Sequence, residues 1–206
     1  MIYIISGPPR CGKTTIANKL SKSWISADTI ESIIHSNTSK KDLNRLFPKN
    51  VIRKKTKQSN DIMYNSYSTK EIVNAYKKQS KASWKAIETM VACELNNGHN
   101  YIIEGHQIHP KLMNSLVKKY KKNIIPLVLT RFDKDGIVEG CQKHKAKYDW
   151  FIQKTKKKET FYKIAEMIKV YSEFFEKEAE KYGIKVINMD GNFNQQIQEA
   201  VKYIQK

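Results

Sequence analysis

Gly7-Pro8-Pro9-Arg10-Cys11-Gly12-Lys13-Thr14 is the stretch that decides the fold, because it joins a glycine-rich turn to a lysine and a hydroxyl at fixed spacing. The run Ile2-Tyr3-Ile4-Ile5 before it is short, apolar and rich in β-branched residues, which predicts a buried strand. After it, apolar residues recur with helical spacing over 14–20. A strand, a glycine loop and a helix start in this order are the context of a P-loop, or Walker A, motif.

The chemistry of such a loop predicts a nucleotide site. Successive backbone N–H groups surround a phosphate, the helix N-terminus adds a partial positive charge, and Gly7 and Gly12 allow a backbone that a Cβ would obstruct. Lys13 is expected to reach the β- and γ-phosphates of ATP, and the Thr14 hydroxyl is expected to ligate Mg²⁺. The residues expected to bind the nucleotide are Gly7, Pro8, Pro9, Arg10, Cys11, Gly12, Lys13, Thr14 and Thr15.

Length and composition fit one domain with its own core. The chain has 206 residues, of which 40% are hydrophobic. No stretch approaches the roughly 20 apolar residues of a membrane span, and the N-terminal run is too short for a signal peptide. Cys11, Cys93 and Cys141 lack metal-ligand spacing and an evident disulfide framework, so we expect a cytoplasmic protein with no membrane partner. For Cys11 two roles stay open, an oxidisable thiol at a helix start or, in preference, a small space-filling residue.

The formal net charge of +18 has two interpretations. It would attract polyanions or phosphorylated substrates, including nucleic acid. It would also follow from a general lysine bias, because lysine is abundant throughout while arginine occurs only at positions 10, 45, 53 and 131. The total charge does not decide between these two interpretations.

The remaining pattern alternates strands and helices. Five apolar runs predict strands, at 2–5, 24–26, 101–104, 124–130 and 184–189. Helices are expected between them, including a long one that starts at the capping box Ser68-x-x-Glu71 and stops at Gly98. Pro126 indicates an irregularity or an edge position in the fourth strand. This order predicts an α/β fold with a five-stranded parallel sheet covered on both faces.

Two segments lack clear periodicity and are basic. The pattern of residues 36–60 predicts a mobile basic segment over the site, and Pro48 should break any helix there. The alternative is a solvated loop that does not contact a ligand. Residues 131–158 are expected to be irregular and to contain a lid that closes over the transferred phosphate. The basic groups proposed for this lid are Arg131, Lys143, His144, Lys145 and Lys147.

Two carboxylates follow predicted strands at the sheet edge where open α/β sheets bind ligands. Asp28 and Glu104 could hold Mg²⁺ or accept the proton of an attacking hydroxyl. The alternative for Asp28 is a helix N-cap in the spacing Asp28-x-x-Glu31, and the alternative for Glu104 is a structural acceptor. His106 and His109 lie beside Glu104, and acceptor contact or plain surface is preferred to zinc binding.

The segments Ser26-Ala27-Asp28-Thr29-Ile30 and Ile102-Ile103-Glu104-Gly105, with Pro110 beyond, resemble the P-loop small-molecule kinases. The nearest likeness is to 2-phosphoglycerate kinase and its zeta-toxin-like and seryl-tRNA kinase relatives. The resemblance implies the strand order 2-3-1-4-5 and a flexible lid. It also implies that Asp28 lies near the acceptor hydroxyl and Glu104 near Mg²⁺ or the acceptor. The sequence departs from these families in two ways. Glu31 stands where they often have arginine, and an acid there should disfavour an anionic acceptor. The expected lid carries lysines in place of arginines.

Together these features predict an ATP- and Mg²⁺-dependent kinase that phosphorylates a hydroxyl of a small molecule. Its catalytic residues would be Lys13, Asp28, Glu104 and Arg131, and its metal ligands Thr14, Asp28 and Glu104. One alternative is a kinase for a nucleotide or for a nucleic-acid or tRNA-linked hydroxyl. That reaction would use the basic segments with the aromatic residues Tyr64, Tyr67, Trp150 and Phe151. A second alternative is a nucleotide-dependent switch, and the oligomeric state is left open.

Overall fold

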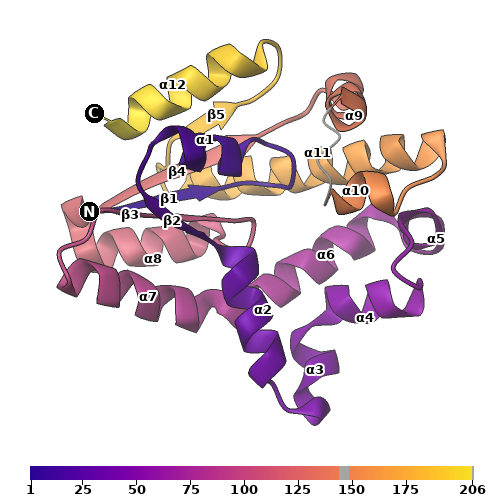
Figure 1. Ribbon diagram of the computed structural model, residues 1–206, viewed down its shortest axis with the longest axis horizontal. Coiled ribbons are helices and arrows are strands. Elements are labelled where there is room, and N and C mark those ends of the chain that lie inside the picture. Colours follow the sequence, from indigo (N-terminus) through magenta and orange to yellow (C-terminus); the bar gives the residue numbers. More distant parts are fainter. Residues whose placement is uncertain (144–148, 206) are drawn as a thin grey trace.

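The computed structural model describes residues 1–143 and 149–205, and within them the strands form one five-stranded parallel sheet (Figure 1). The order is β2-β3-β1-β4-β5, which confirms the predicted α/β architecture and strand order. The strands are β1 (Ile2–Ser6), β2 (Ser23–Ser26), β3 (Tyr101–Glu104), β4 (Ile124–Thr130) and β5 (Val186–Asn188). Because β1 is central, the loop that follows it emerges in the middle of the carboxyl edge of the sheet.

Alternating apolar side chains on each strand explain why both faces are covered. In β1, Ile2 and Ile4 point into the larger core cluster, while Ile5 points into the smaller one. The smaller cluster packs under α1 (Lys13–Lys19) and α12 (Phe193–Gln205). The larger cluster packs against the helices on the other side of the sheet, α6 (Thr69–Ser80), α7 (Trp84–Asn96), α8 (Pro110–Tyr120) and α11 (Lys158–Lys181) (Figure 1).

The expectation that residues 36–60 lack regular structure is wrong. After α2 (Ala27–Asn37) come α3 (Lys40–Leu46), α4 (Pro48–Lys55) and α5 (Asn60–Ser66), and α3 and α4 stand apart from the sheet in Figure 1. Pro48 starts α4 at its first turn, where its missing N–H costs nothing. Phe47, which is fully buried, anchors the junction between α3 and α4. One buried aromatic residue therefore fixes two short, mostly polar helices whose periodicity is too weak to detect.

Residues 131–158 also contain helices, contrary to the expectation. They include α9 (Lys134–Lys143) and α10 (Trp150–Gln153). Ile137, Val138 and Cys141 form the buried stripe of α9, which packs on α11. Gly136 and Gly140 lower the helix propensity of this stretch, which explains why the helix was missed.

Two smaller expectations are refined. The long helix predicted from Ser68 to Gly98 is divided into α6 and α7 by a 3₁₀ turn, Lys81–Ser83, although the capping box at Ser68 and Glu71 is present. Strand β4 as a whole lies between β1 and β5, so it is not an edge strand. Pairing with β5 begins only at Val128, however, so Pro126 lies where β4 is hydrogen-bonded to β1 alone. Among the described residues, no helix is both long enough and apolar enough to cross a membrane.

Candidate functional site

The loop between β1 and α1 requires glycine at both ends. Gly7 has φ of 136°, and a Cβ there would lie 2.1 Å from the carbonyl oxygen of Leu129. Gly12 has φ of 87° at the N-cap of α1, and a Cβ would lie 2.8 Å from the ring of Phe193. Both positions combine a left-handed backbone with close contact, so the sequence pattern has the physical cause that was expected for it.

Lys13 is buried and turns back over the loop, where its Nζ donates to the carbonyl oxygen of Pro8 at 2.6 Å. The Lys13 ammonium is therefore held inside the P-loop, where the phosphates of a nucleotide are expected to bind. Cys11 is fully buried behind the loop, and burial raises the pKa of its thiol to about 11. The thiol is neutral and enclosed, so Cys11 fills space and the oxidisable alternative is wrong.

Glu104, at the end of β3, lies beside the P-loop helix. The Thr14 hydroxyl donates to Glu104 Oε1 at 3.2 Å, and the carboxylate is buried. Burial raises the pKa of Glu104 above its ordinary value, although the nearby Lys13 opposes this shift. A carboxylate and a hydroxyl in contact are oxygen ligands of the kind that Mg²⁺ prefers, so these two residues fit a magnesium site next to the loop.

Asp28 lies at the start of α2, but it does not cap the helix. The cap is Ser26, whose side chain accepts from the backbone N–H of Asp28, so the N-cap alternative is wrong. The carboxylate is two-thirds exposed (67%), lies 3.7 Å from His106 Nδ1, and accepts from Gln107 Nε2 at 2.6 Å. Asp28 is thus free to act on a bound molecule.

The surroundings of Asp28 keep it ionised. Partial removal from water at the floor of the cavity would raise the pKa of Asp28. The charge of Lys49, the hydrogen bond from Gln107 and the charge of Lys13 oppose this and bring the pKa below its ordinary value. Gln107 carried no signal in the sequence, because a glutamine three residues after a strand is unremarkable until the fold places it against Asp28.

The two histidines have different surroundings, and neither is on the surface. Both are buried, and burial lowers the pKa of each to about 3, so both are neutral. His106 faces Asp28, whereas His109 lies 3.0 Å from the Tyr171 hydroxyl inside an aromatic cluster. His106 therefore belongs to the site, and His109 belongs to the core.

Glu31 does not present a free charge to the site. It is buried, and its Oε1 accepts from Lys49 Nζ at 3.1 Å and from Gln79 Nε2 at 2.7 Å. The expectation that this acid disfavours an anionic acceptor therefore loses its basis, because a lysine 18 residues along the chain pairs with it.

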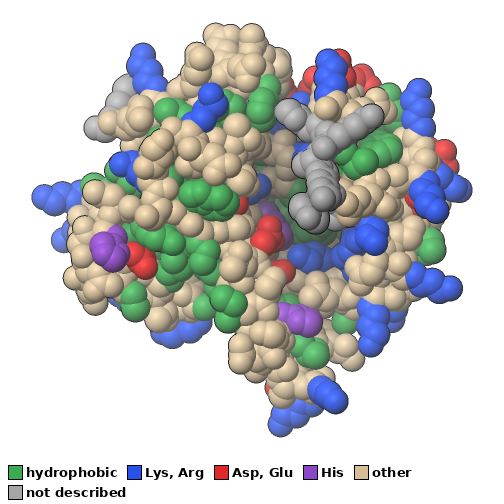
Figure 2. Space-filling model, in the orientation of Figure 1, with side chains coloured by type: hydrophobic (Ala, Val, Ile, Leu, Met, Phe, Trp, Pro, Cys, Tyr) green, Lys and Arg blue, Asp and Glu red, His purple; other side chains and the backbone are tan. Residues whose placement is uncertain are grey.

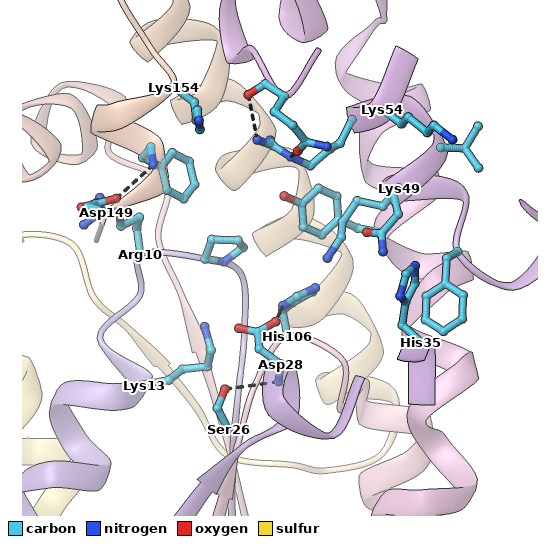
Figure 3. A pocket seen from close by; sticks show the side chains of 18 of the residues that line it. Arg10, Lys13, Ser26, Asp28, His35, Lys49, Lys54, His106, Asp149 and Lys154 are labelled. Carbon is cyan, nitrogen blue, oxygen red and sulfur yellow. Dashed lines mark hydrogen bonds and ion pairs between the residues drawn. The ribbon is translucent and has the colours of Figure 1, made fainter. Parts of the chain in front are cut away.

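One large cavity of about 1660 Å³ is lined by Lys13, Thr14, Asp28, Glu104 and His106. The P-loop supplies one side, with Lys13 and Thr14, and α4 supplies the opposite side. In Figure 3, Lys13 and Lys49 point into the cavity from opposite sides, with Asp28 and His106 between them. Figure 2 shows carboxylate, histidine and basic side chains gathered around this hollow. Lys49 was within the basic segment, but its sequence context did not distinguish it from the lysines around it.

The two arginines expected near the phosphates are placed differently. Arg10 forms an ion pair with Asp149, lies 5.0 Å from the centre of the Phe151 ring, and lines the cavity. Arg131 donates to the carbonyl oxygens of Arg10 at 3.4 Å and Gly136 at 2.8 Å, and it is not among the described residues that line the cavity. Its guanidinium lies over Phe193, behind the loop.

Other residues named from the sequence lie away from the site or outside the described residues. Lys143 is exposed at the end of α9 and pairs with Glu139. His144, Lys145 and Lys147 lie outside the described residues. Tyr64 and Phe151 are buried, so they offer no open stacking surface for nucleic-acid bases, and Tyr67 packs against the core.

Comparison with solved structures gives matches along the whole chain. A gluconokinase from Sinorhizobium meliloti 1021 has a TM-score of 0.53 at 10% identity, covering 98% of this chain and 90% of that one. Dephospho-CoA kinase from Campylobacter jejuni has a TM-score of 0.46 at 17% identity, covering 99% and 95%. An uncharacterized protein from Eubacterium ventriosum ATCC 27560 has a TM-score of 0.46 at 14% identity, covering 100% and 98%. No family model and no curated protein matches the sequence. The chain therefore shares its fold with the gluconokinase, and at this identity the likeness extends to the fold alone.

Proposed function

We propose that the protein is an ATP- and Mg²⁺-dependent kinase that transfers the γ-phosphoryl group to a hydroxyl of a small molecule. The observation that carries the proposal is the single cavity in which the P-loop lysine, the Thr14–Glu104 pair and the ionised Asp28 meet. Its volume, about 1660 Å³, exceeds that of an ordinary ligand pocket, so it can accept nucleotide phosphates and a second molecule together. The fold shared with a gluconokinase agrees with this function.

The P-loop would bind and neutralise the phosphates. Lys13 is already held over the loop at Pro8, and a nucleotide would replace that carbonyl as its partner. The loop backbone is fixed by Gly7 and Gly12, so its N–H groups need little reorganisation when the phosphates bind. Positioning and charge neutralisation of this kind supply most of the catalysis in phosphoryl transfer.

Thr14 and Glu104 would hold Mg²⁺, because they place a hydroxyl and a carboxylate in contact beside the loop. A bound Mg²⁺ held by these two residues would offset negative charge on the transferred phosphoryl group. The raised pKa of Glu104 belongs to the protein alone, and a cation beside the carboxylate would lower it again. The metal role considered for Asp28 is less well supported, since its contacts are with Gln107 and His106 and not with Thr14.

Asp28 would accept the proton of the acceptor hydroxyl or orient that hydroxyl for attack. It is ionised and exposed to the cavity, and Gln107 fixes one of its oxygens. The second oxygen is then available to the acceptor, within the hydrogen-bond distance that a general base needs. Neutral His106 lies at its other side and adds no competing positive charge.

The alternatives are less favoured. Cationic side chains of the segment 36–60 line the same cavity as the P-loop, which suits a small acceptor better than a polynucleotide. A nucleotide-dependent switch transfers the phosphoryl group to water, so it does not need the room for a second molecule that this cavity offers.

A screen tests the proposal. ADP formation is measured with Mg²⁺ and ATP, with and without each of a panel of sugars, sugar acids, nucleosides, nucleotides and tRNA. A kinase shows ADP formation that depends on one class of acceptor, whereas a switch hydrolyses ATP at a rate that no acceptor changes.

A further inference from the structure

The side of the cavity opposite the P-loop carries positive charge that the nucleotide does not require. Among the described residues that line the cavity, seven are lysine or arginine and three are carboxylates. Arg10 pairs with Asp149, and Lys13 belongs to the P-loop. The remaining cations lie on α4 or just after α10, and they are Lys49, Arg53, Lys54, Lys55 and Lys154.

Lys49 is the best held of these cations. Its side chain is only 15% exposed, its Nζ donates to Glu31 Oε1 at 3.1 Å, and it lies 5.1 Å from the centre of the Tyr76 ring. Burial alone would lower the pKa of Lys49, but Glu31 and then Tyr76 oppose this, and the pKa lies above its ordinary value. The ammonium is therefore a permanent charge at a fixed place.

A polar clamp sets the position of Lys49. Gln79 of α6 donates to Glu31 Oε1 at 2.7 Å and to Asn50 Oδ1 at 3.1 Å, and its own Oε1 accepts from the Asn50 backbone N–H at 3.1 Å. Glu31 and Gln79 do not line the cavity, whereas Lys49 does. The clamp therefore lies outside the cavity, while Figure 3 shows the Lys49 side chain pointing into it.

We propose that Lys49 is the anchor for an anionic group, a phosphate or a carboxylate, carried by the alcohol that this enzyme phosphorylates. The proposal rests on the proposed function and names the substrate class of that site. Among the described residues, the Lys49 ammonium donates one hydrogen bond, to Glu31. Its other two N–H groups then remain for a ligand. An acceptor held by its anionic group at Lys49 would place its hydroxyl toward Asp28, which faces Lys49 across the cavity.

An ion pair that serves only stability explains this arrangement less well. Replacing a buried ion pair by apolar residues is often neutral or stabilising, so the Lys49–Glu31 pair is weak evidence for a purely structural role. Buried Phe47 already anchors the start of α4, and Gln79 binds Asn50. A ligand-binding role accounts for a lysine that is rigid, charged and directed into a cavity.

The experiment compares three proteins. The test variant combines Lys49→Gln with Glu31→Gln, because removing the lysine alone would leave a buried carboxylate without its partner. The matched control is Lys41→Gln, which removes one positive charge from exposed α3 at a residue that does not line the cavity. Two measurements are made: the KM for matched acceptors with and without a phosphate or carboxylate group, and the binding of inorganic phosphate and of acetate to protein saturated with Mg²⁺ and a non-hydrolysable ATP analogue.

The expected result is that wild type prefers acceptors with an anionic group. The double variant should raise the KM for them roughly 10- to 100-fold, as expected for one lost charge-assisted hydrogen bond. The KM for ATP should stay unchanged in the double variant. The Lys41→Gln control should keep the wild-type KM for every acceptor. The phosphate and acetate arms show which anion the subsite takes, and the double variant should weaken that binding similarly.

A wild-type preference for neutral acceptors, or unchanged KM and anion binding in a folded double variant, would overturn the inference while leaving the kinase intact. Anion binding that depends on Lys49, without turnover of any acceptor, would support the anion site and contradict the proposed function.

Discussion

Replacing Asp28 by asparagine removes the charge at the acceptor side of the cavity with little other change. Ser26 and not Asp28 caps α2, so the cap is kept. The Asn carbonyl oxygen can still accept from Gln107, whose Nε2 lies 2.6 Å from Asp28 Oδ1. The carboxylate loses its attraction to the N-terminus of α2, to Lys49 and to Lys13, and the loss is partly offset because its charge no longer has to be desolvated. The free energy of unfolding should therefore fall by no more than about 1 kcal/mol.

The effect on phosphoryl transfer should be far larger. Loss of a general base usually lowers the rate by roughly 10²–10⁴-fold, which corresponds to about 3–5 kcal/mol in the barrier. ATP affinity should be retained, because among the described residues the Asp28 carboxylate forms its hydrogen bond and its close contact with Gln107 and His106, and not with the P-loop. The assay measures thermal unfolding, ATP affinity and acceptor-dependent turnover on one preparation of each protein.

Three results are informative about Asp28. Normal turnover by Asp28→Asn would refute its role as base, since the substitution removes the charge and leaves the geometry. Loss of ATP affinity would place Asp28 on the metal instead. A large loss of stability would contradict the assignment of the cap to Ser26.

Three further variants test the other side of the cavity. Lys13→Ala should fold normally and bind ATP at least about 10-fold more weakly, because a charge-assisted contact with the phosphates is lost; unchanged affinity by calorimetry would contradict the P-loop assignment. Glu104→Gln should raise the melting temperature near neutral pH and lower Mg²⁺-dependent turnover on the order of 10²-fold or more. Burial raises the pKa of Glu104 in the folded state, so the folded protein favours the protonated side chain. The contribution of Glu104 to the free energy of unfolding is therefore fully present below its unfolded pKa and is lost as pH rises through its folded pKa. The gain from glutamine should therefore disappear in acid, and a gain independent of pH would be inconsistent with this cause. Gly7→Ala should destabilise the protein by more than about 1 kcal/mol in chemical denaturation, because its Cβ would lie 2.1 Å from the Leu129 carbonyl oxygen, whereas exposed Gly98→Ala has no such contact and should cost less.

The sequence predicted the sheet because its signals are local. The apolar runs at Ile2–Ser6 and Ile124–Thr130 are long enough and β-branched enough to indicate buried strands on their own. The carboxyl ends of parallel strands share one edge, so the positions of Asp28 and Glu104 followed from the strands. What could be predicted of the site was therefore the part that depends on strand order and the P-loop.

The remainder depends on contacts between residues far apart in the chain. The charge of Glu31 looked free until Lys49 and Gln79 were placed against it. Helix α4 depends on one buried residue, Phe47, and on the Gln79 clamp, and neither gives a periodic pattern. His109 could not be assigned to the core, because its aromatic partners come mainly from α11, more than 60 residues later.

Transfer of a radiolabelled γ-phosphoryl group tests the central claim most directly. Wild type is incubated with labelled ATP, Mg²⁺ and the acceptor panel, with Lys13→Ala as the blank, and the labelled products are separated and identified. The account predicts that the label moves from ATP to a hydroxyl of a small anionic alcohol, in step with ADP formation. Label released only as inorganic phosphate, at a rate that no acceptor changes, would contradict it.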